Sequence, residues 1–248
     1  MSDETAATDH VTREILPWVT RNWKSSRIET HQIWNELGEF WGAQIDIGFV
    51  LSQEVIDDPV GLLSLEIQPD LEAAILLAIS GFYRHATLIL RSMLDLAFAS
   101  VWFSFNRDEF DQWWKGDQAA PFQHRGIMGG PMLTELMNKN SSLRKAEEKF
   151  HLVERGMRMH LDLSDYVHTK GEKAMDISHR NDTVPHYYPE ELKAWFERFR
   201  EVFEIWVVLV FARYPRLLTM KQYPKEMGDI MATLSGETKV KLEELKEP

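Results

Sequence analysis

A charged pair, Arg91 and Asp95, lies within the otherwise largely apolar segment 81–105. If this segment is helical, the four-residue spacing brings both side chains to one face, where they can form an ion pair. Arginine is also the side chain best suited to planar binding of an anion such as phosphate. The pair is therefore either a structural ion pair that fixes how a buried helix packs or part of a site at which Arg91 binds an anionic ligand.

The segment 161–168 contains a second candidate group, Ser164 and His168, which share one face of a helix. Histidine suits general acid–base catalysis or ligand binding because its pKa lies near neutrality. The same histidine, close to Lys170 and Gly171, could instead cap the last turn of the helix. Both interpretations remain open for His168.

Two stretches together, GFYRHATLILRSMLDLAF and LSDYVHTKG, resemble bacterial helical proteins related to the HEPN superfamily. The resemblance covers about a third of the chain. It implies a helical bundle, usually a homodimer, of the kind found in toxin–antitoxin and phage-defence systems. Active HEPN ribonucleases need no metal and use an Arg-x(4–6)-His motif, in which histidine is the base and arginine stabilises the phosphate. The shared polar residues here would be Arg91, Ser92, Asp95, Ser164 and His168.

The chain departs from that motif at His168, because no arginine lies five to seven residues before it. Three other pairs have the required spacing: Arg144 and His151, Arg155 and His160, and Arg180 and His186. Pro185 would interrupt a helix in the last pair. We therefore take Arg155 and His160 as the second choice for catalytic residues, behind His168, Arg91, Asp95 and Ser164. A degenerate relative that binds RNA or a nucleotide without cleaving it is equally consistent with the resemblance.

Two alternatives belong to other functional classes. The chain could be a non-enzymatic interaction protein, in which the nine tryptophans and the Gly-rich loop 116–131 contact a protein partner. It could also be a metal-dependent bundle enzyme, because acid-x-x-His pairs occur at Glu148/His151, Asp165/His168 and Asp176/His179. Such pairs occur by chance at a similar frequency, and the central helix adds only Asp95. We therefore predict no metal and no cofactor.

The composition of the chain argues against several classes of function. The formal charge of −11 disfavours broad DNA or other non-specific nucleic-acid binding. The absence of cysteine excludes disulfides, thiolate zinc sites and a cysteine nucleophile. The polar start is unlike a secretory signal, and no apolar run reaches the roughly 20 residues of a membrane span. We expect a cytoplasmic protein without a membrane segment.

Helical periodicity and helix start and stop signals predict the elements that position these residues. Pro69 suits a helix start, and the pattern then continues past Ser80 and Gly81 with a possible kink. The segments expected to be helical are 11–24, 28–56, 68–106, 107–115, one from Pro131, one from Asn140 that Gly156 could break, 157–170, and Pro189 to just before Pro215. No segment alternates with a period of two, so no sheet is expected.

The predicted fold is therefore all-α, a single HEPN-like bundle of about seven or eight helices. We expect a disordered tail over 1–9, the bundle domain over 10–235 and a fraying tail over 236–248. The functional hypothesis requires Arg91 and Asp95 to face inward and to lie near His168. A homodimer, an RNA or nucleotide ligand and a protein partner are the expected interactions.

Overall fold

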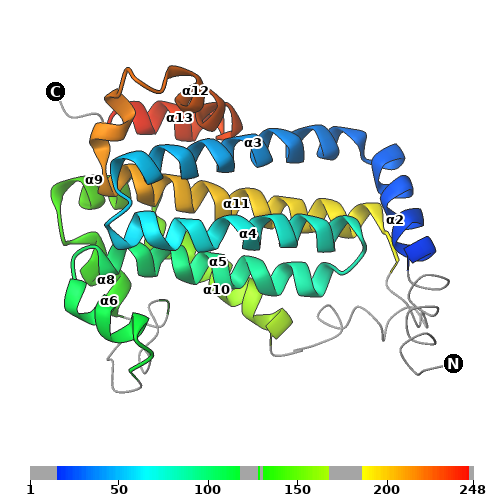
Figure 1. Ribbon diagram of the computed structural model, residues 1–248, viewed down its shortest axis with the longest axis horizontal. Coiled ribbons are helices and arrows are strands. Elements are labelled where there is room, and N and C mark those ends of the chain that lie inside the picture. Colours follow the sequence, from blue (N-terminus) through cyan, green and yellow to red (C-terminus); the bar gives the residue numbers. More distant parts are fainter. Residues whose placement is uncertain (1–15, 118–127, 129–130, 168–185, 246–248) are drawn as a thin grey trace, which may run out of the picture.

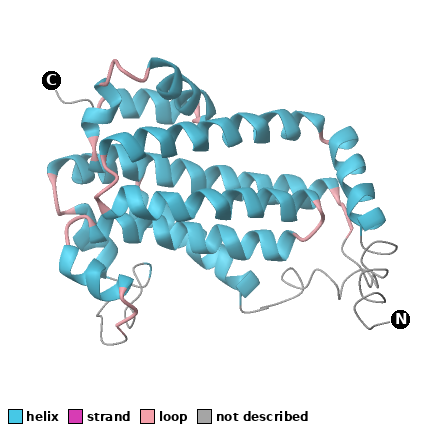
Figure 2. Cartoon of the chain, viewed as in Figure 1, coloured by secondary structure: helices cyan, strands magenta, loops and turns pink. Residues whose placement is uncertain are grey.

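The computed structural model describes residues 16–117, 128, 131–167 and 186–245, and all regular structure in these ranges is helical (Figures 1 and 2). The prediction of an all-α protein is confirmed. The eleven α-helices in these ranges exceed the expected seven or eight. They are α2 (Leu16–Glu29), α3 (His31–Glu54), α4 (Pro59–Ile79), α5 (Tyr83–Phe103), α6 (Arg107–Trp114), α8 (Pro131–Met137), α9 (Ser141–Phe150), α10 (Leu152–Val167), α11 (Pro189–Arg213), α12 (Pro224–Thr233) and α13 (Gly236–Glu243), with a short 3-10 helix η4 (Pro215–Thr219).

Four long helices, α3, α4, α5 and α11, run side by side and form the body of the bundle (Figure 1). Helix α10 packs along α5 and also contacts α11. Helix α12 packs on α3, while the short helices α6, α8 and α9 gather at one end. Helix α2 lies across the other end, against α3 and α4.

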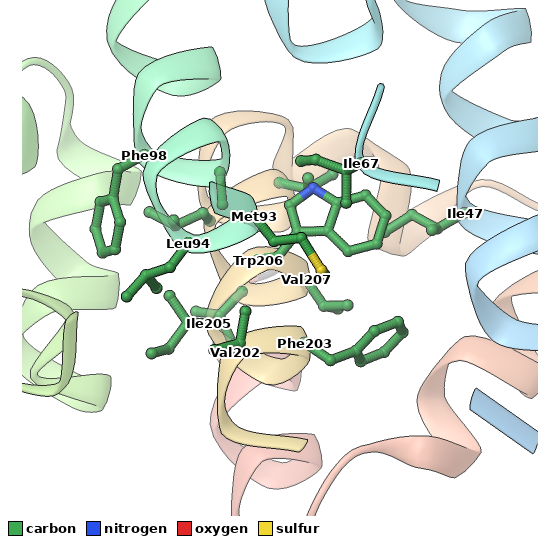
Figure 3. Packing of buried hydrophobic residues seen from close by; sticks show 14 of the residues in the cluster. Ile47, Ile67, Met93, Leu94, Phe98, Val202, Phe203, Ile205, Trp206 and Val207 are labelled. Carbon is green, nitrogen blue, oxygen red and sulfur yellow. The ribbon is translucent and has the colours of Figure 1, made fainter. Parts of the chain in front are cut away.

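The hydrophobic core lies between the four long helices, and α11 is its most buried member. From Ile205 to Ala212 every side chain of α11 is at most 1% exposed. Figure 3 shows Trp206 packed with Ile67 and Met93, which belong to α4 and α5. Burial on all sides explains why α11 is apolar all round from Ile205 to Ala212, whereas its earlier turns carry charged residues on one side.

Helix α4 begins ten residues earlier than predicted, at Pro59 instead of Pro69. The Asp58 side chain accepts a hydrogen bond from the Val60 backbone N–H at 2.9 Å, and Pro59 occupies the first turn. This cap satisfies one of the N–H groups that a helix start leaves unpaired. Pro69 consequently lies inside the helix and does not mark its start.

The predicted helix 68–106 is wrong as a single element, because the chain reverses at 80–82 and α5 returns alongside α4. Gly81 adopts φ +86°, a left-handed conformation that glycine accepts without strain. The apolar pattern continues through this turn because both helices face the same core. The expected kink is in fact a tight helical hairpin.

The break predicted at Gly156 lies five residues earlier, at His151, whose φ of 50° ends α9. Helix α10 then continues through Gly156. A Cβ atom at position 156 would lie 2.7 Å from Cζ of Phe98. Gly156 therefore serves close packing of α10 against α5 instead of ending a helix.

Residues 236–245, for which the sequence predicted a fraying tail, include helix α13. Helix α13 is capped by Ser235, and the side chains of Leu242 and Leu245 are buried. The hydroxyl of Thr238 donates to Glu204 of α11 at 2.6 Å, which fixes the tail to the core. The tail predicted over 1–9 lies outside the described residues.

Helix α5 is the one described helix that is long and apolar enough to cross a membrane. However, 67% of its apolar window is buried inside the bundle. Such burial is what the core helix of a soluble protein requires, because its apolar side chains already have protein neighbours.

Candidate functional site

Arg91 and Asp95 face α10 across the α5–α10 contact. The Arg91 guanidinium forms an ion pair with Asp95 one turn along the same helix. Its Nε–H donates to the Ser164 hydroxyl of α10 at 3.1 Å, and its Nη2 lies 3.1 Å from Nε2 of His160. Three predicted residues, Arg91, Asp95 and Ser164, therefore meet, and His160 lies beside them.

His160 lies between the two charges of the pair. An arginine nitrogen can only donate, so Nε2 of His160 accepts from Arg91 and the ring proton is on Nδ1. Nδ1 faces Oδ1 of Asp95 at 3.4 Å, which is long for a hydrogen bond. Neither of these two buried atoms has a hydrogen-bond partner among the described residues. Unsatisfied buried polar atoms are uncommon and are one mark of a functional site.

The environment keeps His160 neutral. Burial, together with the positive charge of Arg91, lowers the pKa of His160 from 6.5 to about 4. Burial also lowers the pKa of Arg91 from its usual value. At pH 7 the cluster therefore holds a cationic guanidinium next to an uncharged imidazole.

The cluster is only partly covered. The side chains of Arg91, Asp95 and His160 are 22%, 37% and 20% exposed. Part of each of these three side chains is therefore open to solvent at the α5–α10 contact. A fully buried ion pair would not offer that access.

The other residues predicted from the sequence have different outcomes. Ser92 is exposed. His168 lies outside the described residues, as do most of the loop 116–131 and both Asp176 and His179. His160 was considered only as a partner of Arg155, yet it precedes Ser164 by four residues. The same spacing rule that joined Ser164 to His168 could have identified it.

Arg155 and His160 do not form a pair, because five residues separate them by about 140° around a helix. Arg155 instead faces α11, where Nε lies 2.8 Å from Glu201 and Nη2 lies 3.0 Å from Glu204. Glu204 also accepts from Thr238 of α13. Arg155 thus joins three helices and is a structural residue in this arrangement.

Within the described ranges, no three His, Cys, Asp or Glu side chains are close enough together to hold a metal ion. The pair Glu148/His151 therefore has no third ligand in those ranges. The other two acid-x-x-His pairs include residues outside them.

No protein-family model, curated protein or solved structure matches this chain. The function must therefore be inferred from the geometry of the cluster formed by Arg91, Asp95, His160 and Ser164, which we call the Arg91–His160 cluster.

Proposed function

We propose that the chain is a HEPN-like, cytoplasmic protein of a bacterial defence or toxin–antitoxin system and that its Arg91–His160 cluster cleaves RNA without a metal ion. One observation carries the proposal: a charged guanidinium and a neutral imidazole lie 3.1 Å apart at a partly exposed helix contact. These are the two groups that metal-independent RNA cleavage requires, one to stabilise the phosphate and one to take a proton.

In this mechanism a phosphodiester enters between Arg91 and His160 and replaces their hydrogen bond. Nε2 of His160 accepts the proton of the ribose 2′-hydroxyl, whose oxygen attacks the adjacent phosphorus. The bond from phosphorus to the 5′-oxygen breaks, and the leaving oxygen takes a proton from water. The hydroxide so formed takes the proton back from the His160 imidazolium, which restores the neutral base. The products are a 2′,3′-cyclic phosphate and a 5′-hydroxyl. Arg91 stabilises the negative charge that develops on the phosphate oxygens.

Asp95 and Ser164 position these two groups. The Asp95 carboxylate faces the Nδ1 proton of His160 and so favours the tautomer in which Nε2 is free to act as a base. Ser164 holds the Nε side of the guanidinium. A bound phosphate would also offset the charge of Arg91, which lowers the pKa of His160, and would make the imidazole a stronger base.

The proposal is tested with labelled single-stranded RNA in the presence of EDTA. The wild type should produce 2′,3′-cyclic phosphate ends. His160→Ala should cleave at least about 100-fold more slowly, the usual contribution of a general base. Arg91→Lys should also be impaired because lysine lacks the planar fork. The matched control is His31→Ala, since His31 is exposed and belongs to α3.

Equal cleavage by the wild type and His160→Ala, with both folded by circular dichroism, would show that the cluster is not catalytic. RNA binding without cleavage would identify a degenerate RNA-binding relative. The resemblance also implies a homodimer, which sedimentation of the wild type tests.

A protein-interaction function is the second candidate, and one observation favours it. The side chain of Trp114, at the end of α6 and next to the loop 116–131, is 55% exposed. A large exposed aromatic side chain is typical of residues that anchor a protein partner. Loss of partner capture in Trp114→Ala, with RNA cleavage unchanged, would assign this surface to that role.

A further inference from the structure

A hollow of about 890 Å³ lies between α2, α3 and α4, at the end of the bundle where α2 crosses the longer helices (Figure 1). Its walls include the side chains of Trp23, Trp34 and Trp41 from α2 and α3, with Ile75 and Leu76 from α4. The volume falls within the range of about 300–1,000 Å³ that is usual for small-molecule sites. The Arg91–His160 cluster contributes nothing to these walls.

The aromatic walls are held in place by hydrogen bonds on their polar edges. The indole N–H of Trp23 donates to the Ser80 hydroxyl at 2.8 Å, and that of Trp34 donates to the Ser26 hydroxyl at 3.2 Å. Two indole donors are therefore already used inside the protein. The walls offer a ligand apolar contact and few hydrogen bonds, so a nucleobase, whose edge needs polar partners, fits them poorly.

Lys24 and Arg27 supply the only charges among the described lining residues. Both side chains are exposed, and neither forms an ion pair with another described residue. Among the described residues neither cation has an ion-pair partner and no carboxylate lines the hollow, which stands out on a chain whose formal charge is −11. The two cations favour an anionic group at the rim of the hollow.

Gly38 keeps the α3 wall open. Glycine in the middle of a helix costs stability relative to alanine, yet a Cβ atom at position 38 would meet no atom within 4 Å. Close packing inside the chain therefore does not explain this glycine. Gly38 is one of the lining residues, so its missing side chain adds to the space of the hollow.

We propose that this hollow binds a small amphipathic anion. Its apolar body would lie against the tryptophans and the α4 side chains, and its carboxylate or sulfonate would contact Lys24 and Arg27. A second copy of the chain is a poorer occupant, because a symmetric contact would bring the same two cations back to the same rim.

The test uses two probes with the full-length protein: dodecanoate and its neutral counterpart dodecanol. Binding is measured by displacement of 1-anilinonaphthalene-8-sulfonate and by tryptophan fluorescence. The wild type should bind one dodecanoate. The double variant Lys24→Gln/Arg27→Gln should bind dodecanoate roughly tenfold more weakly, with dodecanol binding changed less than about twofold. Lys115→Gln changes an exposed residue at the C-terminal end of α6 that does not line the hollow, and it should alter neither.

A second pair of variants tests the space itself. Gly38→Leu should fill the hollow and weaken binding of both probes by at least about tenfold. Gly42→Leu is the matched control, since position 42 has equally open space but does not line the hollow. Undiminished binding in Gly38→Leu, or equal loss in Gly42→Leu, would overturn the proposal. The proposal would also be overturned if Gly38→Leu dissociated a dimer in sedimentation without changing probe binding, because a second copy of the chain would then be the occupant.

Discussion

Two arginines on neighbouring helix contacts have opposite surroundings. Arg155 lies between two carboxylates, Glu201 and Glu204, and these raise its pKa despite burial. Arg91 has one carboxylate, a neutral imidazole and a hydroxyl, and burial lowers its pKa. The first guanidinium is fully neutralised and holds helices together. The second keeps donors and a neighbouring base that a ligand can use, which is why we assign the chemistry to Arg91.

The largest expected effect comes from removing the structural arginine. Arg155→Ala would leave Glu204 without a described cation and Glu201 with only the exposed Arg158 at 3.5 Å, and the side chains of Glu201 and Glu204 are only 24% and 17% exposed. Loss of one partner of such a group typically costs about 3 kcal/mol. Urea denaturation should show this loss, while RNA cleavage per folded molecule should stay unchanged. A loss of cleavage larger than the loss of folded protein would contradict the distinction between the two arginines.

The next effect depends on pH. The pKa of His160 is about 4 in the folded protein and 6.5 in the unfolded chain, so the unfolded chain binds a proton first as the pH falls. The free energy of unfolding should therefore decrease between pH 6.5 and pH 4, by about 1–2 kcal/mol after solvent screening.

His160→Gln should remove that part of the pH dependence, and urea denaturation at pH 7.5, 5.5 and 4.5 measures it. The control is His31→Gln, since His31 is exposed and should leave the pH profile intact. Identical pH profiles for the wild type and His160→Gln would mean that the imidazole is not held neutral by its surroundings.

The smallest effect concerns how strongly inorganic phosphate binds near each of the two arginines. Asp95→Asn should change stability by less than about 1 kcal/mol, because Asp95 is 37% exposed. The variant leaves Arg91 without its carboxylate and should increase the thermal stabilisation that inorganic phosphate gives. Glu201→Gln should give no such increase. Equal responses of the two variants would remove the contrast between an available and a neutralised arginine.

Sequence patterns predicted which residues within one helix lie together better than they predicted contacts between helices. The four-residue spacing of Arg91 and Asp95 was sufficient to predict their ion pair. Helical period alone could not show that the chain reverses at Gly81, because a buried apolar pattern does not change across a tight turn. The place of His160 beside Arg91 also depended on how α10 lies against α5, and that orientation is a tertiary property. Arg155 had the expected spacing to His160 but pointed to a different helix.

The close approach at Gly156 fixes an antiparallel register between α5 and α10. Phe98 meets Gly156, Asp95 faces His160 and Arg91 binds Ser164. One helix thus carries the sequence pattern Arg-x-x-x-Asp-x-x-Phe and the other carries Gly-x-x-x-His-x-x-x-Ser, read in opposite directions. A methyl group at position 156 would push α10 away from Phe98, so the glycine acts as a spacer for chemistry one turn further along. Other chains with the same mechanism should retain this small residue four positions before their histidine.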